Sequence, residues 1–484
     1  MRRQSRTRRR RDRKGRSRQR RGGNRVGARS PIGASGGLIT VIGGGLAGCE
    51  AAWQAARCGA DVALYEMRPH RSGPAHKTGA LAELVCSNSL RGAALSNAVG
   101  LLKEELARLD SLVIGAARAS AVPAGGALAV DRERFAAEVE ARLATQSRIA
   151  VRREEVRAIP AGRPVVIACG PLPTQELLAE IDRTLAAAAG PAGGARRLHY
   201  FDAASPIVAA ESIDETATYR KSRYEKGDGD DYLNIPLDRE QYRALVADLR
   251  TLERLQPKDF ESGDARYFEG CLPIEEMADR GEETLRFGPL KPVGLRDPRT
   301  GKTPHAVVQL RKENVAGTAF NLVGFQTRLT WPAQKAAFGK LPGLQHAEWL
   351  RLGVMHRNTF VDSPRLLDAR LMLRGSDGLY FAGQITGAEG YVEAAACGAI
   401  AGIAAARAGA GLPVLDVPRE SAFGAVVAHL QNAQTHDFQP ANVTWAAFPP
   451  PDREIRDKRL RREAMSERAL AAIDAFAARL LQAE

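Results

Sequence analysis

The sequence lacks the features that mark several classes of protein. Its six cysteines include no C-x-x-C pair, which argues against a zinc site or a vicinal disulfide and favours a reducing compartment. No window approaches the roughly 18 apolar residues of a membrane span, and the first residues contain no apolar stretch of about 7–15 residues typical of a secretory signal. We therefore expect a soluble, cytoplasmic protein with no metal and no membrane partner.

Acidic residues are almost missing from the first 30 positions, where the positive charge is concentrated. The whole chain has a formal charge of +14, yet these positions hold 15 basic side chains against Asp12, and the other 454 residues hold 55 of each sign. Only Met1, Val26 and Ala28 are apolar here, too few to offset the entropy of ordering. We predict a disordered tail over 1–37. It could be an RNA-binding arm, a solvated extension, or the product of an upstream start that is not the real one.

A dinucleotide-binding pattern begins where the chain becomes apolar. Buried strands are predicted over 38–42 and 61–66, with a helix over 49–57 between them. The glycines of the G-x-G-x-x-G turn before this helix permit close approach of a pyrophosphate, which the helix N-terminus attracts. An acid at the end of the second strand is placed to bind ribose hydroxyls. The predicted contacts are Gly43, Gly44, Gly45, Leu46, Ala47, Gly48 and Glu66.

A second glycine-rich segment lies near the other end of the chain. A short strand over 379–382 leads into a turn and then into an alanine-rich helix up to Arg407. A nucleotide site divided between distant parts of the chain favours FAD over NAD, because NAD enzymes more often keep the Rossmann unit in one block. The predicted FAD contacts of this segment are Gly383, Gln384, Gly387, Glu389, Gly390 and Tyr391.

These patterns predict an α/β fold in which both ends of the chain form a Rossmann-like FAD-binding domain. Its two parts are expected over 38–199 and 346–450, and the short strands and turns of 200–345 indicate an inserted α+β domain on the substrate and RNA side. A charged C-terminal helix is expected over 451–484. Smaller predicted elements are a helix over 97–112, a helix over 131–143 and a linker or surface loop over 186–195.

Six further segments carry a resemblance to one family. They are Ala82–Arg91, Val122–Asp131, Phe268–Glu275, Arg286–Leu295, Phe320–Thr327 and Gly353–Phe360. With the glycine-rich segments they make the sequence similar, over about 38–484, to the folate- and FAD-dependent tRNA (uracil-5-)-methyltransferases, relatives of the GidA/MnmG wobble-uridine enzymes. The resemblance implies that 5,10-methylenetetrahydrofolate donates a carbon and that FAD, reduced by NADPH or NADH, supplies electrons. The implied product is 5-methyluridine at position 54, in the T loop of tRNA.

Three other functions remain open at this point. The same chemistry could act on a ribosomal RNA uridine, or the protein could have a GidA/MnmG-like role at the wobble uridine. The third is a non-catalytic, flavin-bound RNA-binding protein. A plain disulfide reductase is disfavoured because the redox pair is missing.

The resemblance also assigns roles to two cysteines and a histidine. Uracil C5 becomes reactive when a thiolate adds to C6, and Cys271 matches the nucleophile proposed for the family. Cys86 matches a second cysteine near the flavin, with a role in handling the transferred carbon or in protonation. His356 matches a histidine that stacks on the folate pterin. The competing interpretation of Cys271 is a buried structural cysteine, and that of His356 is a hydrogen-bonded loop histidine. The cysteines expected to serve packing are Cys49, Cys58, Cys169 and Cys397.

RNA contacts are predicted from local clusters because the body of the chain has no net charge. The segment 219–226 interleaves aromatic side chains with cations, which suits stacking on bases and contact with phosphates. The cations of 453–468 are mixed with acids, which favours a solvated helix face. The predicted RNA contacts are Arg220, Lys221, Arg223, Tyr224 and Lys226.

Overall fold

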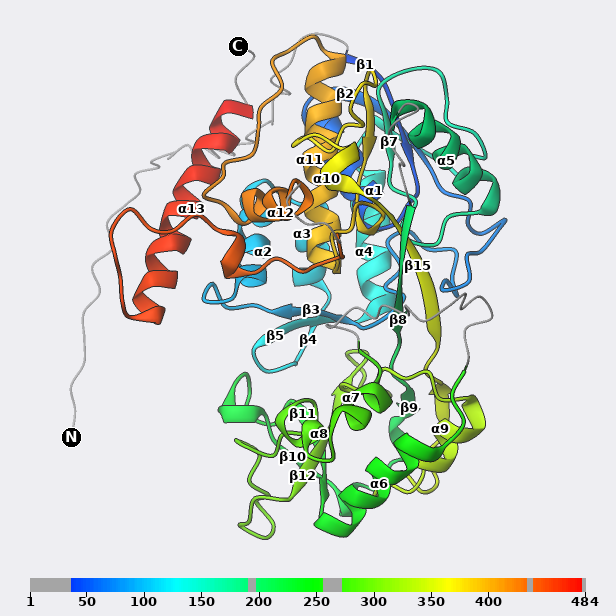
Figure 1. Cartoon of the computed structure of the whole chain (residues 1–484), viewed down its shortest axis with the longest axis vertical. Helices are drawn as coiled ribbons and strands as arrows, with labels where there is room; N and C mark the ends of the chain where they lie inside the picture. Colours follow the sequence, from blue (N-terminus) through cyan, green and yellow to red (C-terminus); the bar gives the residue numbers. More distant parts are fainter. Residues whose placement is uncertain (1–35, 190–196, 256–271, 433–437, 481–484) are drawn as a thin grey trace, which may run out of the picture.

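Two lobes and a connecting ribbon make up the described part of the molecule (Figure 1). The ribbon pairs β8 (Arg197–Ala203) with β15 (Met355–Val361) in antiparallel register, so the chain enters and leaves the smaller lobe side by side. The larger lobe is built from both ends of the chain, and the smaller lobe from its middle. The computed structural model describes residues 36–189, 197–255, 272–432 and 438–480.

A parallel sheet of five strands forms the centre of the larger lobe. Its order is β16 (Leu379–Phe381), β7 (Val165–Ile167), β1 (Gly36–Ile42), β2 (Ala60–Tyr65) and β6 (Ile149–Arg152). Val41 of β1 pairs with Leu64 on one side and Val166 on the other, and all three side chains are fully buried. Such apolar strands are typical of a parallel sheet covered on both faces. The predicted Rossmann-like α/β fold is confirmed, with β16 contributed by the C-terminal half.

Helices α1 (Leu46–Arg57) and α11 (Tyr391–Gly409) pack together and join the two halves of this lobe. A Cβ atom at Gly398 would lie 2.2 Å from the carbonyl oxygen of Ala47, and Gly402 meets α1 as closely. The prediction that no window is apolar enough for a membrane span is wrong for α11, which passes that test by length and composition. However, 89% of its apolar window is buried inside the protein, as in the core helix of a globular fold.

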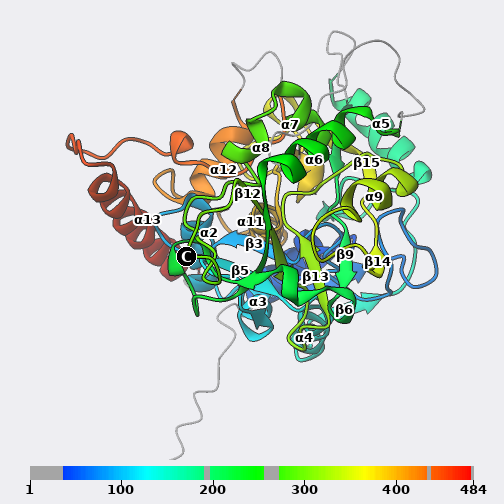
Figure 2. The ribbon, with the colours of Figure 1, turned by 90° about the horizontal axis from the view of Figure 1, so that it is seen from below.

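Further helices and a small sheet complete the larger lobe, with α13 along its outer edge (Figures 1 and 2). The small sheet has the order β3 (Ser89–Gly92), β5 (Ala127–Val130), β4 (Ala121–Val122). The helices are α2 (Ala98–Arg108), α3 (Leu112–Ala119), α4 (Arg132–Ala144), α5 (Gln175–Ala189), α10 (Ser363–Leu366), α12 (Ala422–Leu430) and α13 (Lys458–Leu480).

Some predicted boundaries need correction. The helix predicted over 97–112 is two helices, because Asp110 has a left-handed φ of 53° and Ser111 then caps α3 by accepting a hydrogen bond from the Ile114 amide. Residues 186–189 belong to α5 rather than to a linker, in keeping with the high helix propensity of alanine. The C-terminal helix begins at Lys458, and residues 36–37, placed in the tail, belong to β1. The rest of the predicted tail, 1–35, lies outside the described residues.

An antiparallel sheet of six strands forms the smaller lobe. Its hydrophobic core is separate and draws on residues between Val208 and Leu344. Asp238 starts α6 with a capping box that includes Gln241, which satisfies amides at the helix end. The helices are α6 (Arg239–Thr251), α7 (Ile274–Arg280), α8 (Thr284–Phe287) and α9 (Trp331–Phe338). The strand order is β10 (Tyr219–Arg220), β11 (Tyr232–Leu237), β12 (Ala306–Lys312), β13 (Ala319–Leu322), β9 (Ile207–Ala209), β14 (Trp349–Arg351).

Candidate functional site

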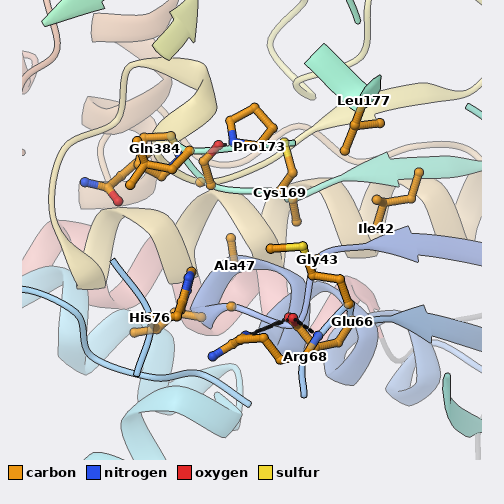
Figure 3. Close-up of a pocket in the computed structure, with 18 of the residues that line it drawn as sticks. Ile42, Gly43, Ala47, Glu66, Arg68, His76, Cys169, Pro173, Leu177 and Gln384 are labelled. Carbon is orange, nitrogen blue, oxygen red and sulfur yellow. Dashed lines mark hydrogen bonds and ion pairs between the residues drawn. The ribbon is translucent and has the colours of Figure 1, made fainter. Parts of the chain in front are cut away.

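A cleft lies outside the carboxyl ends of four parallel strands, where open α/β sheets bind their ligands. Gly43, Glu66, Cys169 and Gly383 line it, just beyond β1, β2, β7 and β16 respectively. Figure 3 shows Arg68 and His76 on one wall and Cys169, Pro173 and Gln384 on the other. We call this the first cleft; with its open mouth it holds about 1080 Å³.

The glycine-rich turn brings backbone, rather than side chains, to the floor of the first cleft. Gly43 has a φ of 106°, and a Cβ atom at Gly48 would lie 1.8 Å from the carbonyl oxygen of Gly43, so α1 can pack against the turn only without a side chain there. A Cβ atom at Gly45 would meet nothing within 4 Å. Gly45 precedes α1 directly, which leaves the amide end of the helix open to an anion.

Glu66 holds this turn in place through a buried network. Its Oε2 accepts hydrogen bonds from the Gly44 amide (2.8 Å) and Arg68 Nη2 (3.0 Å), and its Oε1 accepts from Arg68 N (2.9 Å) and Nε (2.8 Å). Burial opposes ionisation of Glu66, but the hydrogen bonds and charge of Arg68 outweigh it and lower the pKa of Glu66. Four donors already fill the carboxylate, so the predicted ribose contact requires one of them to be exchanged and stays a prediction.

Two buried polar side-chain atoms in the first cleft have no hydrogen-bond partner among the described residues. They are Nδ1 of His76 and Oγ1 of Thr174. Burial lowers the pKa of His76, so its ring is neutral near pH 7. Cys169, expected in the core, instead lies half-buried in the cleft wall, and burial raises the pKa of its thiol to about 12. With the open amide end of α1, these groups fit a dinucleotide such as FAD, whose hydroxyls and phosphates need such partners.

A second cleft adjoins the first and shares its Gln384 and Tyr391. It brings together Cys86 and His356, which are 270 positions apart in the chain. His356 is half-buried, and burial lowers the pKa of its imidazole. Of the C-terminal residues predicted to contact FAD, Gly383 lines the first cleft, Glu389 and Gly390 the second, and Gly387 neither, since it faces Phe438. Other polar residues that line the second cleft are Ser87, Ser89, Arg91, Arg311, Gln326, Asn358 and Asn442.

Arginines from both lobes hold the loop that carries Cys86. Arg132 of α4 donates hydrogen bonds to the carbonyl oxygens of Leu84 and Cys86, the second at 2.9 Å. Arg351 of β14 donates to the carbonyl oxygen of Val85 at 2.6 Å. The charges of both guanidinium groups act on the Cys86 thiol, and an adjacent cation favours the thiolate form of a cysteine.

A third arginine fixes the next two residues of the loop. Arg311 of β12 donates to Ser87 Oγ and Asn88 Oδ1, both at 2.9 Å. Among these three arginines, Arg132 also forms an ion pair, with its Nε 2.6 Å from a carboxylate oxygen of Glu313. Because Arg311 and Arg351 belong to the smaller lobe, that lobe helps to set the position of Cys86 in the larger one.

An ion pair lies at the wall of the second cleft, where Arg91 is a lining residue. Arg91, with a left-handed φ of 64°, pairs with both carboxylate oxygens of Glu393, whose side chain is fully buried. Lys103 interacts with the charges of both groups and donates a hydrogen bond to the carbonyl oxygen of Gly92 at 2.8 Å. Burial, aided by the charge of Arg91, lowers the pKa of Lys103 to about 7.

The segment predicted to contact RNA is only partly free at the surface. Tyr219 is buried and donates its hydroxyl to the backbone (2.6 Å), and Arg223 donates to the Val293 carbonyl and to Gln309. Tyr224 is 57% exposed and has a left-handed φ of 59°. Of the other cations, Arg220 and Lys226 are exposed and Lys221 is half-buried. Their contact with RNA stays a prediction, and Cys271, the predicted nucleophile, lies outside the described residues.

Sequence reasoning missed the arginines around Cys86. Arg132 directly follows Val122–Asp131, and Arg351 lies two residues before Gly353–Phe360. Both segments carry the family resemblance, but neither contains these arginines. Single arginines in different segments form no local sequence pattern that would show that they contact the same loop. Their function depends on two lobes whose relative placement no sequence pattern specifies.

Comparisons with known proteins agree with this geometry. A family model described as glucose inhibited division protein A matches residues 38–413. Two curated relatives, from Geobacter sulfurreducens and Symbiobacterium thermophilum, are both named methylenetetrahydrofolate--tRNA-(uracil-5-)-methyltransferase TrmFO. The first is 54% identical over 90% of this chain and 98% of its own, and the second is 55% identical over 91% and 97%.

A solved structure shows the same fold. GidA of Aquifex aeolicus superposes with a TM-score of 0.66 at 17% identity, over 92% of this chain and 74% of that one. At this identity the likeness concerns the fold alone, whereas the curated relatives align over nearly their full length. The chain belongs to the family of methylenetetrahydrofolate–tRNA-(uracil-5-)-methyltransferases.

Proposed function

We propose that this protein methylates C5 of uridine 54 in the T loop of tRNA, in the cytoplasm. The carbon donor is 5,10-methylenetetrahydrofolate, and the electrons come from FAD reduced by NADPH or NADH. One observation carries the proposal: a cleft built for a dinucleotide joins a cleft that contains Cys86 and His356. The names of the relatives, which specify the folate donor, the tRNA and uracil C5, support it.

Each part of the site has a task in this reaction. FAD, when bound and reduced in the first cleft, supplies the two electrons that bring a carbon at the oxidation level of formaldehyde to a methyl group. The amide end of α1 at Gly45 binds its phosphates, and the open space above that residue admits them. His356 stays uncharged near pH 7 because its pKa is lowered, so its ring can stack on a flat, neutral heterocycle.

The two cysteines act on the uracil. A thiolate that adds to C6 places negative charge on C5, which then attacks the transferred carbon; we assign this step to Cys271 by family resemblance. Cys86 lies among Arg132 and Arg351, which favour its thiolate. In the thiolate form, its sulfur can accept the C5 proton when the pyrimidine regains its double bond.

RNA approaches where the lobes meet. Arg311 and Gln326 of the smaller lobe line the second cleft together with Tyr391 of the larger lobe, so a base inserted there contacts both lobes. The exposed Tyr224 and Lys226 of the smaller lobe add a stacking surface and a charge for the flanking nucleotides.

The test uses FAD-loaded protein, unmodified tRNA, labelled methylenetetrahydrofolate, and NADPH or NADH. We expect label in 5-methyluridine, bleaching of the flavin by the nicotinamide nucleotide, and loss of turnover in Cys86→Ala and Cys271→Ala. Cys58→Ala is the matched control, since Cys58 lines neither cleft. Full turnover in Cys271→Ala would contradict its role as nucleophile, and a colourless protein would contradict the use of FAD.

A further inference from the structure

Asn358 is a buried amide without a partner in the wall of the second cleft. It lies on β15, two positions after His356, and residues two apart in a strand face the same side. The residue is 1% exposed, and neither its Oδ1 nor its Nδ2 has a hydrogen-bond partner in the part of the chain that the structure describes. Amides of this kind are normally bonded in folded proteins, because an unbonded buried polar group opposes folding.

Other buried asparagines of the chain show the usual arrangement. Asn88 donates to two carbonyl oxygens and accepts from Arg311. Asn234 donates to the carbonyl oxygens of Tyr219 and Lys221 and accepts from Gln309. Both side chains are fully buried, so burial alone does not explain why the amide atoms of Asn358 lack hydrogen-bond partners. They are found at the wall of a ligand cleft.

We propose that Asn358 binds the ring-amide edge of a flat heterocycle held against His356 in the second cleft. In such an edge an N–H stands beside a C=O, and the side chain of asparagine offers the complementary pair: Oδ1 accepts from the N–H while Nδ2 donates to the C=O. The pterin of the folate and the target uracil both present this edge. The inference rests on the proposed function, which brings both heterocycles into this cleft.

A substitution separates this role from a structural one. Asn358→Leu keeps the approximate volume and removes both polar atoms. Because the side chain of Asn358 makes no hydrogen bond with the described residues, we expect the variant to melt at the same or a higher temperature than the wild type. Asn234→Leu is the matched control for the folate arm: it breaks a complete set of bonds outside both clefts, so it should melt lower yet retain the wild-type affinity for tetrahydrofolate.

The binding experiment has two arms, both with FAD-loaded protein. In the first, tetrahydrofolate is titrated anaerobically and the flavin absorbance is followed. In the second, the affinity for unmodified tRNA with uracil at position 54 is compared with that for the same tRNA lacking the base. A loss of roughly ten- to a hundred-fold in Asn358→Leu in the first arm identifies the pterin as the partner. Loss of the preference for the uracil in the second arm identifies the base.

Other outcomes overturn the proposal. Unchanged results for Asn358→Leu in both arms would show that the amide binds neither heterocycle. A fall in its melting temperature, or loss of FAD, would show a structural or flavin role instead. If the wild type binds neither tetrahydrofolate nor tRNA, the proposed function itself fails, whereas normal wild-type binding with an unaffected variant removes only the role of Asn358.

Discussion

Arg132 donates a hydrogen bond to the carbonyl oxygen of Cys86 at 2.9 Å, and its charge acts on the thiol of the same residue. Since each charge favours the ionised form of the other, Arg132→Gln should raise the pH at which Cys86 becomes reactive. We expect iodoacetamide to alkylate Cys86 several-fold more slowly at pH 7, measured by mass spectrometry of its peptide. Arg57→Gln, at a surface ion pair with Asp110, is the control, and an unchanged pH profile would contradict the prediction.

Substitutions at two glycines of the Gly43–Gly48 turn should have different effects. Gly48→Ala places a methyl group against the carbonyl oxygen of Gly43 and should lower the stability of the flavin-free protein by about 1–3 kcal/mol. Gly45→Ala meets no protein atom, so the protein should fold normally but lose flavin, because the methyl group enters the space left for phosphate. Thermal melting and flavin content measure the two effects. Equal losses in both quantities for both variants would argue against this division.

Removal of either partner of the buried Glu66–Arg68 pair should strongly lower the free energy of unfolding. Arg68 is 1% exposed and Glu66 5%, and removal of one partner from such a pair costs about 3–5 kcal/mol. We expect this loss in denaturant unfolding of Glu66→Gln and of Arg68→Met, with a double variant less destabilised than the sum. Additive losses would show that the two groups act independently. Since the pKa of Glu66 is lowered, its stabilising contribution should disappear as the pH falls through that lowered pKa.

Lys103 should make stability rise with pH. Its pKa falls from 10.5 in the unfolded chain to about 7 in the fold, so between these values the unfolded chain binds more protons. Burial of the charged Lys103 ammonium lowers the free energy of unfolding by its full amount below pH 7, and this cost disappears as the pH rises toward 10.5. Lys103→Met removes the titration, so its gain in melting temperature over the wild type should be largest near pH 6–7 and shrink by pH 10. A gain independent of pH would contradict the lowered pKa.

The sequence specified the nucleotide-binding half better than the catalytic half. The turn at Gly43–Gly48 has a local pattern, because glycine spacing follows directly from close packing between α1 and the strand before it. Cys86 and His356 were found through family resemblance, and their shared cleft is consistent with it. Arg311, Arg351 and Asn358 were not singled out, because their roles depend on the docking of two lobes and on bonds that Asn358 does not make. The break at Asp110 was missed because left-handed backbone at a residue other than glycine has little local signature.

The most direct test of the account is the fate of the methylene carbon in a single turnover. FAD-loaded protein, reduced anaerobically, is mixed with carbon-labelled 5,10-methylenetetrahydrofolate and either an unmodified tRNA or the same tRNA with cytidine at position 54. The account predicts stoichiometric label at C5 of uridine 54 in the first tRNA and none in the second. Absence of label from the first tRNA, or equal label in both, would contradict it.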